Sequence, residues 1–157
     1  MNRVIRTIGI ISDTHGTVPR AVYDLFKDVD EIIHAGDIDN PEVLEELRNI
    51  APVIAVHGNM DAVSLKNSLP RSLDFEAYGF RFLVDHVDPV KTFDGRPTIC
   101  IAGHTHQPIV DKSDQVLYIN PGSAVRPKAG HKPSVAVLKL SNDGNAEAEI
   151  LYFEWDE

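Results

Sequence analysis

Several features that would define a special class of protein are scarce in this 157-residue sequence. There is one cysteine, Cys100, so no disulfide can form within the chain. No apolar run approaches the ~20 residues of a membrane-spanning helix, so no membrane partner is expected. Basic residues number 15 against 24 acidic ones, and the net charge of −9 disfavours non-specific binding to nucleic acid.

What is present is an ordinary globular composition, with 43% hydrophobic and 25% charged residues. The length suits one hydrophobic core, so we expect a single domain over residues 1–157. Arg3 and Arg6 stand near an apolar run at residues 4–11, as in a signal peptide, but the run is too short and no small-residue cleavage site follows it. We therefore expect a cytoplasmic protein.

Strands and helices alternate in the first half of the chain. Apolar runs at 4–11, 31–34 and 52–56 predict buried strands, and Pro19 and Pro41 stand at the starts of amphipathic helices between them. This β-α-β-α-β order is typical of a parallel sheet. The second half predicts strands only, at residues 73–76, 80–84, 98–102, 109–110, 116–119, 135–140 and 146–153. We expect a four-layer α/β fold, with two packed mixed β-sheets flanked by helices.

Polar side chains with adjacent glycines follow five of these strands. The segments are SDTHG at 12–16, HAGD at 34–37, HGNMD at 57–61, DH at 85–86 and GHTH at 103–106. Any one of them could be an ordinary turn. Because the carboxyl ends of strands in an open α/β sheet share one edge, where ligands bind, we expect the five segments to converge.

The chemistry of these side chains favours a metal site. Carboxylate, imidazole and amide groups without thiolate suit Mn²⁺, Fe²⁺, Zn²⁺, Ni²⁺ or Co²⁺. The candidate ligands are Asp13, His15, Asp37, Asn59, His86, His104 and His106. They are too many for one such ion and fit two ions ~3.5–4 Å apart that share Asp37 as a bridge. His104 and His106 would point the same way on an extended chain.

In combination and order, the motifs resemble those of calcineurin-like metallophosphoesterases. The matching residues are Asp13 and His15, Gly36 and Asp37, Gly58, Asn59 and Asp61, His86, and Gly103, His104 and His106. The short length and Asn120-Pro121-Gly122-Ser123 are similar to the small YfcE-like phosphodiesterase branch. The resemblance spans residue 4 to about residue 153.

This resemblance implies a β-sandwich with a dinuclear metal centre that hydrolyses small phosphate diesters. The first metal would be held by Asp13, His15, Asp37 and His106, and the second by Asp37, Asn59, His86 and His104. A bridging hydroxide would attack phosphorus, with Asp37, Asn59 and His104 in catalytic positions. Mn²⁺ is the metal expected first, and relatives form homodimers or homotetramers.

The chain departs from the family pattern in two places. Met60 stands where many relatives carry a histidine that assists the leaving group, so we expect good activity only on esters with acidic leaving groups. No glycine follows His86, and only 17 residues separate His86 from His104, which predicts a short loop and an altered rim.

Five further residues are candidates for supporting or substrate-binding roles. His34 is expected to hydrogen-bond near the bridging position, and Asp61 to orient backbone or a ligand. His57 is a candidate proton donor or an ordinary loop histidine. Asn120 and Arg126 either line the site, where an arginine would suit a phosphate, or form a structural turn with a surface arginine.

Two other functions remain open from the sequence. A retromer subunit has this fold and uses it as a protein-binding scaffold with weakened metal chemistry; the complete ligand set here argues against that reading. A phosphomonoesterase is disfavoured by Met60 and by the small size, which leaves little surface for recognising a large substrate.

Overall fold

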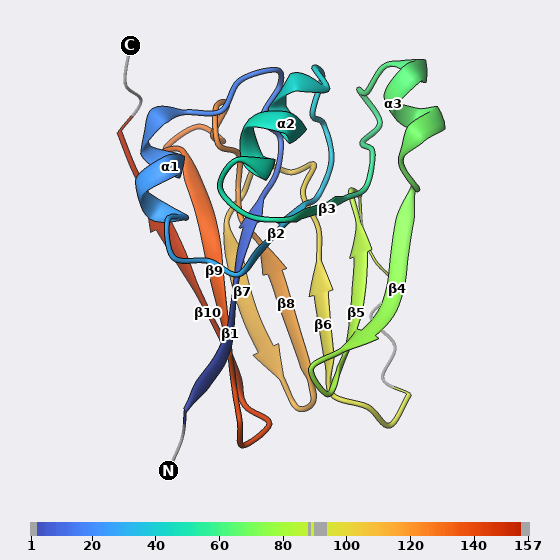
Figure 1. Cartoon of the computed structure of the whole chain (residues 1–157), viewed down its shortest axis with the longest axis vertical. Coiled ribbons are helices and arrows are strands. Elements are labelled where there is room, and N and C mark those ends of the chain that lie inside the picture. The colour runs from blue at the N-terminus through green and yellow to red at the C-terminus, as the bar shows by residue number, and fades with distance from the viewer. Residues whose placement is uncertain (1–2, 88, 90–93, 155–157) are drawn as a thin grey trace.

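Two five-stranded sheets face each other in the computed structural model, which describes residues 3–87, 89 and 94–154. The elements are β1 (Val4–Ile11), α1 (Arg20–Leu25), β2 (Glu31–His34), α2 (Glu42–Arg48), β3 (Val53–Ala55), α3 (Val63–Ser68), β4 (Ser72–Ala77), β5 (Phe80–Asp85), β6 (Thr98–Ile101), β7 (Ile109–Ser113), β8 (Val116–Asn120), β9 (Ser134–Ser141) and β10 (Ala146–Tyr152). The predicted pair of packed mixed sheets is confirmed (Figure 1).

Both sheets contain a parallel core with antiparallel strands at the sides. The first has the order β10-β9-β1-β2-β3, in which β1, β2 and β3 run parallel. The second has the order β4-β5-β6-β8-β7, in which β5, β6 and β8 run parallel. The carboxyl ends of these strands lie at one end of the molecule, at the top of Figure 1. The predicted polar segments therefore meet at that edge.

Apolar side chains fill two layers. The strands of both sheets bury one set of side chains between the sheets, including Ile10, Phe82 and Ile99. A second set lies between the first sheet and the helices, including Phe26 of the turn that ends α1 and Leu47 of α2. The second half of β1 (residues 8–11) and the middle of β2 (Ile32 and Ile33) are buried, and the sequence is continuously apolar there.

The structure adds one helix to the predicted elements. The sequence of α3 has no apolar stripe, and its one buried side chain is Leu65. The short loop predicted between His86 and His104 lies partly on residues 88 and 90–93, outside the described residues. Within the part of the chain that the structure describes, no helix has the length and apolar character needed to cross a bilayer.

Candidate metal centre

Backbone hydrogen bonds join the loops that follow β1 and β2. The N–H of Asp13 donates to the carbonyl of Gly36 at 2.9 Å, and the N–H of His15 donates to the carbonyl of Asp37 at 3.1 Å. These bonds align the first two polar segments along their length. Asp13 and Asp37 are almost fully buried, so both carboxylates point into the protein and not into bulk water.

An unusual backbone conformation recurs at the site. Asp13, His15, Asp37, His104 and His106 all have positive φ angles, between 45° and 68°. This left-handed region is uncommon for residues other than glycine and often marks functional sites. The expectation that His104 and His106 lie on an extended chain is therefore wrong: the chain turns sharply at both, and their rings approach different partners.

The Asp13 carboxylate lies at the middle of the site. Its Oδ1 atom is 3.2 Å from Nε2 of His106, 3.8 Å from Nε2 of His86 and 3.9 Å from Nε2 of His15. Its Oδ2 atom accepts hydrogen bonds from Ser12 Oγ at 2.7 Å and from the N–H of His104 at 3.1 Å. One oxygen is thus anchored to the protein, and the other faces three imidazoles.

The rings of His15 and His106 are oriented by groups outside the cluster. Nδ1 of His15 lies 3.2 Å from Oδ2 of Asp39, and Nδ1 of His106 donates to the carbonyl of Arg126. These contacts fix the proton on Nδ1 and leave the Nε2 lone pair of each ring directed toward Asp13. Such orienting partners are typical of metal-binding histidines.

His86 joins Asp37 to the same cluster. Its Nδ1 donates to the carbonyl of Ala35 at 2.7 Å, and its Nε2 lies 3.1 Å from Oδ2 of Asp37. A Cβ atom at Gly36 would lie 2.7 Å from this ring, so the loop needs glycine there. Burial alone would raise the pKa of Asp37, but the contacts with His86 and with the N–H of Met60 hold it at about 2. Asp37 is therefore an anion near neutral pH.

Three buried polar atoms of the cluster have no hydrogen-bond partner within the described residues: Asp13 Oδ1, His15 Nε2 and His86 Nε2. Buried polar atoms are rarely left unpaired, and Asp13 Oδ1 lies 3.9 Å from His15 Nε2 and 3.8 Å from His86 Nε2. One divalent cation beside His15 and another beside His86 would together satisfy the three atoms. Two triads have donor atoms within 4.8 Å of one another, namely Asp13, His15 and His106, and Asp13, Asp37 and His86. The residues present therefore fit metal binding.

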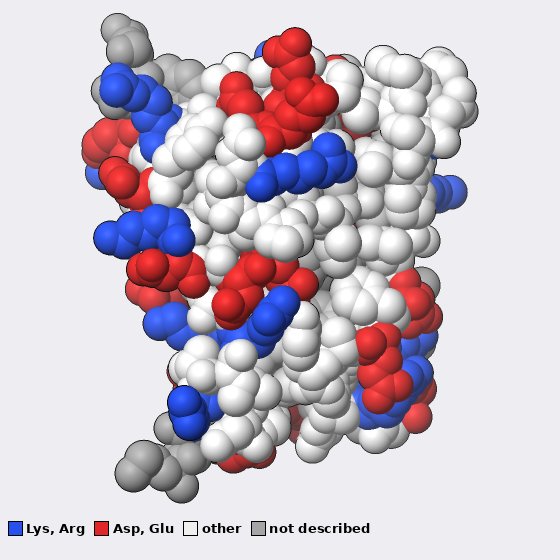
Figure 2. All heavy atoms as spheres, viewed as in Figure 1, with Lys and Arg blue, Asp and Glu red and all other residues white. Residues whose placement is uncertain are grey.

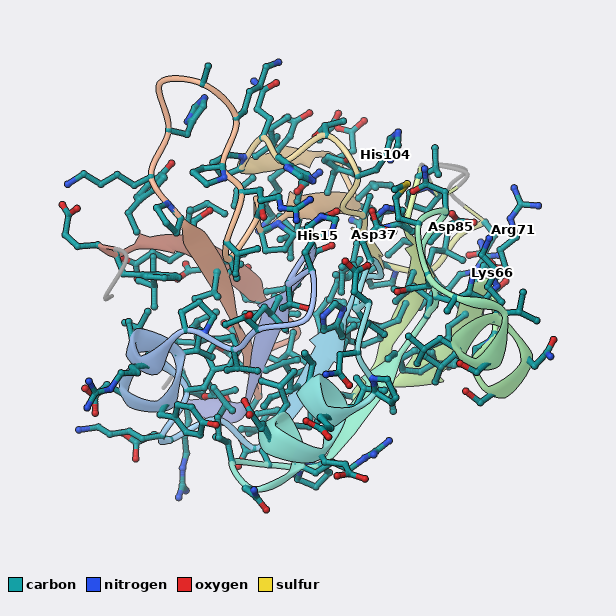
Figure 3. The ribbon with its side chains drawn as sticks, turned by 90° about the horizontal axis from the view of Figure 1, so that it is seen from above. His15, Asp37, Lys66, Arg71, Asp85 and His104 are labelled. Atoms are coloured by element: carbon teal, nitrogen blue, oxygen red, sulfur yellow. The ribbon has the colours of Figure 1, made fainter. Side chains whose placement is uncertain are left out.

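Asn59 and His104 lie at the rim of this cluster. The His104 ring stands edge-on to His86, with 5.3 Å between ring centroids, and Asn59 lines a cavity that also contacts His86. Both side chains are exposed, and neither makes a hydrogen bond to any residue that the structure describes. Figure 3 shows His15, Asp37 and His104 gathered at this edge of the molecule.

The carboxylate of Asp61 organises the loops that carry Asp37. Oδ1 accepts from the N–H groups of Ile38 and Asp39, each at 2.8 Å. Oδ2 accepts from the N–H groups of Asp37 at 3.1 Å and Gly58 at 2.7 Å. Of the two roles expected for Asp61, orienting backbone or a ligand, these four hydrogen bonds are to backbone.

The other candidate residues occupy supporting positions. His34 is fully buried, accepts the N–H of Gly36 on Nδ1 and contacts Thr14 through Nε2. Burial lowers the pKa of His34 to about 4, so it is neutral. Asn120 is also buried, and its Nδ2 donates to the carbonyl of Gly103 at 2.9 Å.

Arg126 and His57 were considered for their side chains, as a phosphate ligand and as a proton donor. Arg126 contributes its carbonyl oxygen to His106, while its side chain is exposed. His57 lines the same cavity as Asn59, and its ring makes a long 3.4 Å contact with the carbonyl of Gly58.

Sequence reasoning missed two anchoring residues. Ser12 holds Asp13 and Asp39 holds His15, and both lie within two residues of a candidate ligand, which was the available signal. Ser123, in the segment 120–123 that the sequence had singled out, donates its Oγ to the carbonyl of Asp13 at 2.8 Å.

Comparison with known proteins agrees with this geometry. Residues 7–143 match the calcineurin-like phosphoesterase superfamily domain. The chain belongs to that superfamily. It is 38% identical to a protein of Methanothermobacter thermautotrophicus named "Probable metallophosphoesterase", over 92% of this chain and 91% of the relative. It is 28% identical to phosphodiesterase YfcE of Escherichia coli K12, over 81% of this chain and 84% of the relative, so the predicted branch is confirmed.

The fold extends to proteins of other kinds. Vacuolar protein sorting 29 of Cryptosporidium parvum superposes with a TM-score of 0.71 at 19% identity, covering 97% of this chain and all of that one. At this identity the likeness shows the fold alone. The metallophosphoesterase fold is therefore established for this chain, and its chemistry has to be argued from the site.

Proposed function

We propose that the protein is a metal-dependent phosphodiesterase that acts through a dinuclear centre. The observation that carries the proposal is that the buried, unpartnered Asp13 Oδ1 lies 3.9 Å and 3.8 Å from two further unpartnered atoms, His15 Nε2 and His86 Nε2. The naming of relatives as phosphodiesterase and metallophosphoesterase supports the reaction class. Residues 1–157 act as one domain in this proposal.

The ligands divide into two sets that share Asp37. Asp13, His15, Asp37 and His106 would hold one ion, and Asp37, Asn59, His86 and His104 the other. The grouping of Asp13 with His15 and His106, and of Asp37 with His86, supports the two sets, and Asn59 and His104 are exposed. The two groups have Asp13 in common, so the bridging place of Asp37 rests on the resemblance to the family. Two Mn²⁺ ions, when bound, would supply a hydroxide nucleophile bridging them and positive charge for the phosphoryl oxygens.

The protein's own groups set which esters react. Met60 is 67% exposed beside Asn59 and has no proton to give to a leaving oxygen. His57, the candidate proton donor, lines the cavity beside Asn59, but the hydrogen bond of its ring to the carbonyl of Gly58 is long, at 3.4 Å. Diesters with acidic leaving groups are therefore the substrates that this site suits, and alkyl esters should react slowly.

Surface charge agrees with a small substrate. The face in Figure 2 mixes acidic and basic side chains, with a wide uncharged area between them. The net charge of −9 opposes long polyanions such as duplex nucleic acid. We therefore propose small phosphate diesters as substrates.

Hydrolysis of bis(p-nitrophenyl) phosphate tests the proposal. Metal-stripped protein should be inactive, Mn²⁺ should restore turnover, and Asp37→Asn should abolish it while the protein stays folded. Turnover that persists in metal-stripped protein would contradict metal dependence. A folded protein that is inactive with Mn²⁺, Ni²⁺ and Zn²⁺ would contradict the enzyme and favour a protein-binding scaffold.

A further inference from the structure

A cavity of about 270 Å³ opens directly beside the proposed metal centre. Its lining includes the candidate ligands Asn59 and His86 and the exposed cations Lys66 and Arg71. Figure 3 shows Lys66, Arg71 and Asp85 grouped to one side of Asp37 and His104. A substrate bound at the metals would therefore extend one ester arm toward two cationic side chains.

The fold holds Arg71 near the ligand His86. Ser72 at the start of β4 pairs with Asp85 at the end of β5, so Arg71 and His86 are the next residues outward on the two antiparallel strands. The N–H of His57 donates to the carbonyl of Pro70 at 3.0 Å. The residues on either side of Arg71 thus hold its backbone in place. Ser72 pairs with the second sheet, and Pro70 accepts a hydrogen bond from the loop that carries Asn59.

Helix α3 places Lys66 on the same side. Leu65 is buried against the layer under the helices, and the N–H of Lys66 donates to the carbonyl of Ala62 at 3.0 Å. Lys66 follows the buried Leu65 in this helix, and its side chain is exposed. No sequence pattern indicated α3, so the structure alone brings Lys66 to this cavity.

Neither cation is neutralised by an ion pair with any residue that the structure describes. Among the described residues that line the cavity, the one carboxylate is that of Asp85, whose Oδ1 accepts the N–H of Val87 at 3.1 Å. With Lys66 and Arg71 positive and Asp85 negative, these three side chains leave a net positive charge. Lys66 and Arg71 are exposed and free of ion pairs with described residues, so both can donate charge-assisted hydrogen bonds to an anionic ligand in the cavity.

We propose that Lys66 and Arg71 form an anion subsite that binds a second phosphate group on one ester arm of the substrate. The preferred substrate class is then a phosphodiester with a further phosphate, as in esters of nucleoside bisphosphates. The guanidinium of Arg71 provides paired donors for phosphate oxygens, and the ammonium of Lys66 adds charge. The expected effect on turnover rests on the proposed diesterase activity, whereas binding of a phosphate group at Lys66 and Arg71 does not.

Two chromogenic diesters test the subsite because they differ by one phosphate. They are thymidine 5′-(p-nitrophenyl phosphate) and its 3′-phosphorylated form. With Mn²⁺-loaded protein, the 3′-phosphate should raise kcat/KM about tenfold, as one charge-assisted hydrogen bond allows. Lys66→Gln with Arg71→Gln should remove that advantage and leave turnover of the unphosphorylated ester nearly unchanged. Lys139→Gln, at an exposed position of β9, is the control for loss of a positive charge away from the cavity.

Calorimetric titration separates failure of the subsite from failure of the enzyme. Thymidine 3′,5′-bisphosphate should bind the Mn²⁺-loaded protein about tenfold more tightly than thymidine 5′-phosphate, and the double variant should lose the difference. Equal binding and equal turnover of each matched pair would overturn the subsite and leave the diesterase. Loss of the preference in Lys139→Gln as well would also overturn it. Absent turnover with a retained binding difference would overturn the diesterase and support the subsite.

Discussion

Replacing Asp61 by asparagine should destabilise the protein through the backbone of the proposed metal loops. The carboxylate accepts four N–H groups, two on each oxygen, at 2.7–3.1 Å. An asparagine keeps one oxygen and turns an NH₂ group toward the other two donors. A buried donor left unpaired costs about 1–3 kcal/mol, so two should cost about 2–6 kcal/mol.

This loss is large against the ~5–15 kcal/mol of a typical domain. Urea denaturation of metal-free protein measures it, and a parallel Mn²⁺ titration should show weaker binding because the N–H groups of Asp37 and Gly58 lose their anchor. Asp30→Asn is the matched control, since its exposed carboxylate accepts one N–H, from Thr7 at 2.7 Å. A loss at Asp61 no larger than that at Asp30 would refute the reasoning.

Three further perturbations follow from the site. Gly103→Ala should abolish Mn²⁺ binding in calorimetry, because the new Cβ would lie 2.0 Å from Ser12 Oγ and 2.8 Å from Asp13 Oδ2; unchanged affinity would contradict that crowding. Burial lowers the pKa of His34 to about 4 in the folded protein. As pH falls, His34 is therefore protonated in the unfolded chain before it is protonated in the folded protein, which favours unfolding. Stability should therefore drop by roughly 3 kcal/mol between about pH 6.5 and 4 and not above, and urea denaturation should show a shallower drop in His34→Gln. Turnover of aryl diesters should fall steeply as the leaving-group pKa rises, and Met60→His should flatten that dependence; a flat wild-type plot would indicate an unrecognised proton donor.

Most of the fold was predictable because its strands carry unambiguous apolar runs. The hairpins at β4–β5 and β9–β10 and the parallel strands β1 to β3 follow the expected residues closely. Helix α3 was not predictable, since a single buried leucine gives no periodic stripe. Its position depends on packing against the rest of the molecule.

The site was predictable in outline because the carboxyl ends of parallel strands share an edge. Asp13, His15, Asp37, His86 and His106 do converge. The detailed geometry could not be predicted, since left-handed backbone in three of the five loops, at Asp13 and His15, Asp37, and His104 and His106, replaces the alternation of an extended chain.

The supporting shell was the least predictable part of the site. The carbonyls of Ala35 and Arg126 orient His86 and His106, and any residue type supplies a carbonyl. Arg126 was considered for its guanidinium, whereas its backbone contacts the site.

Counting bound Mn²⁺ against turnover tests the central claim most directly. Metal-free protein is titrated with Mn²⁺ while bound ions per chain and hydrolysis of bis(p-nitrophenyl) phosphate are measured on the same samples. The account predicts that turnover reaches its maximum at about two ions per chain, because the two sets of ligands share Asp37. Full activity at one ion per chain, or binding of two ions without turnover, would contradict it.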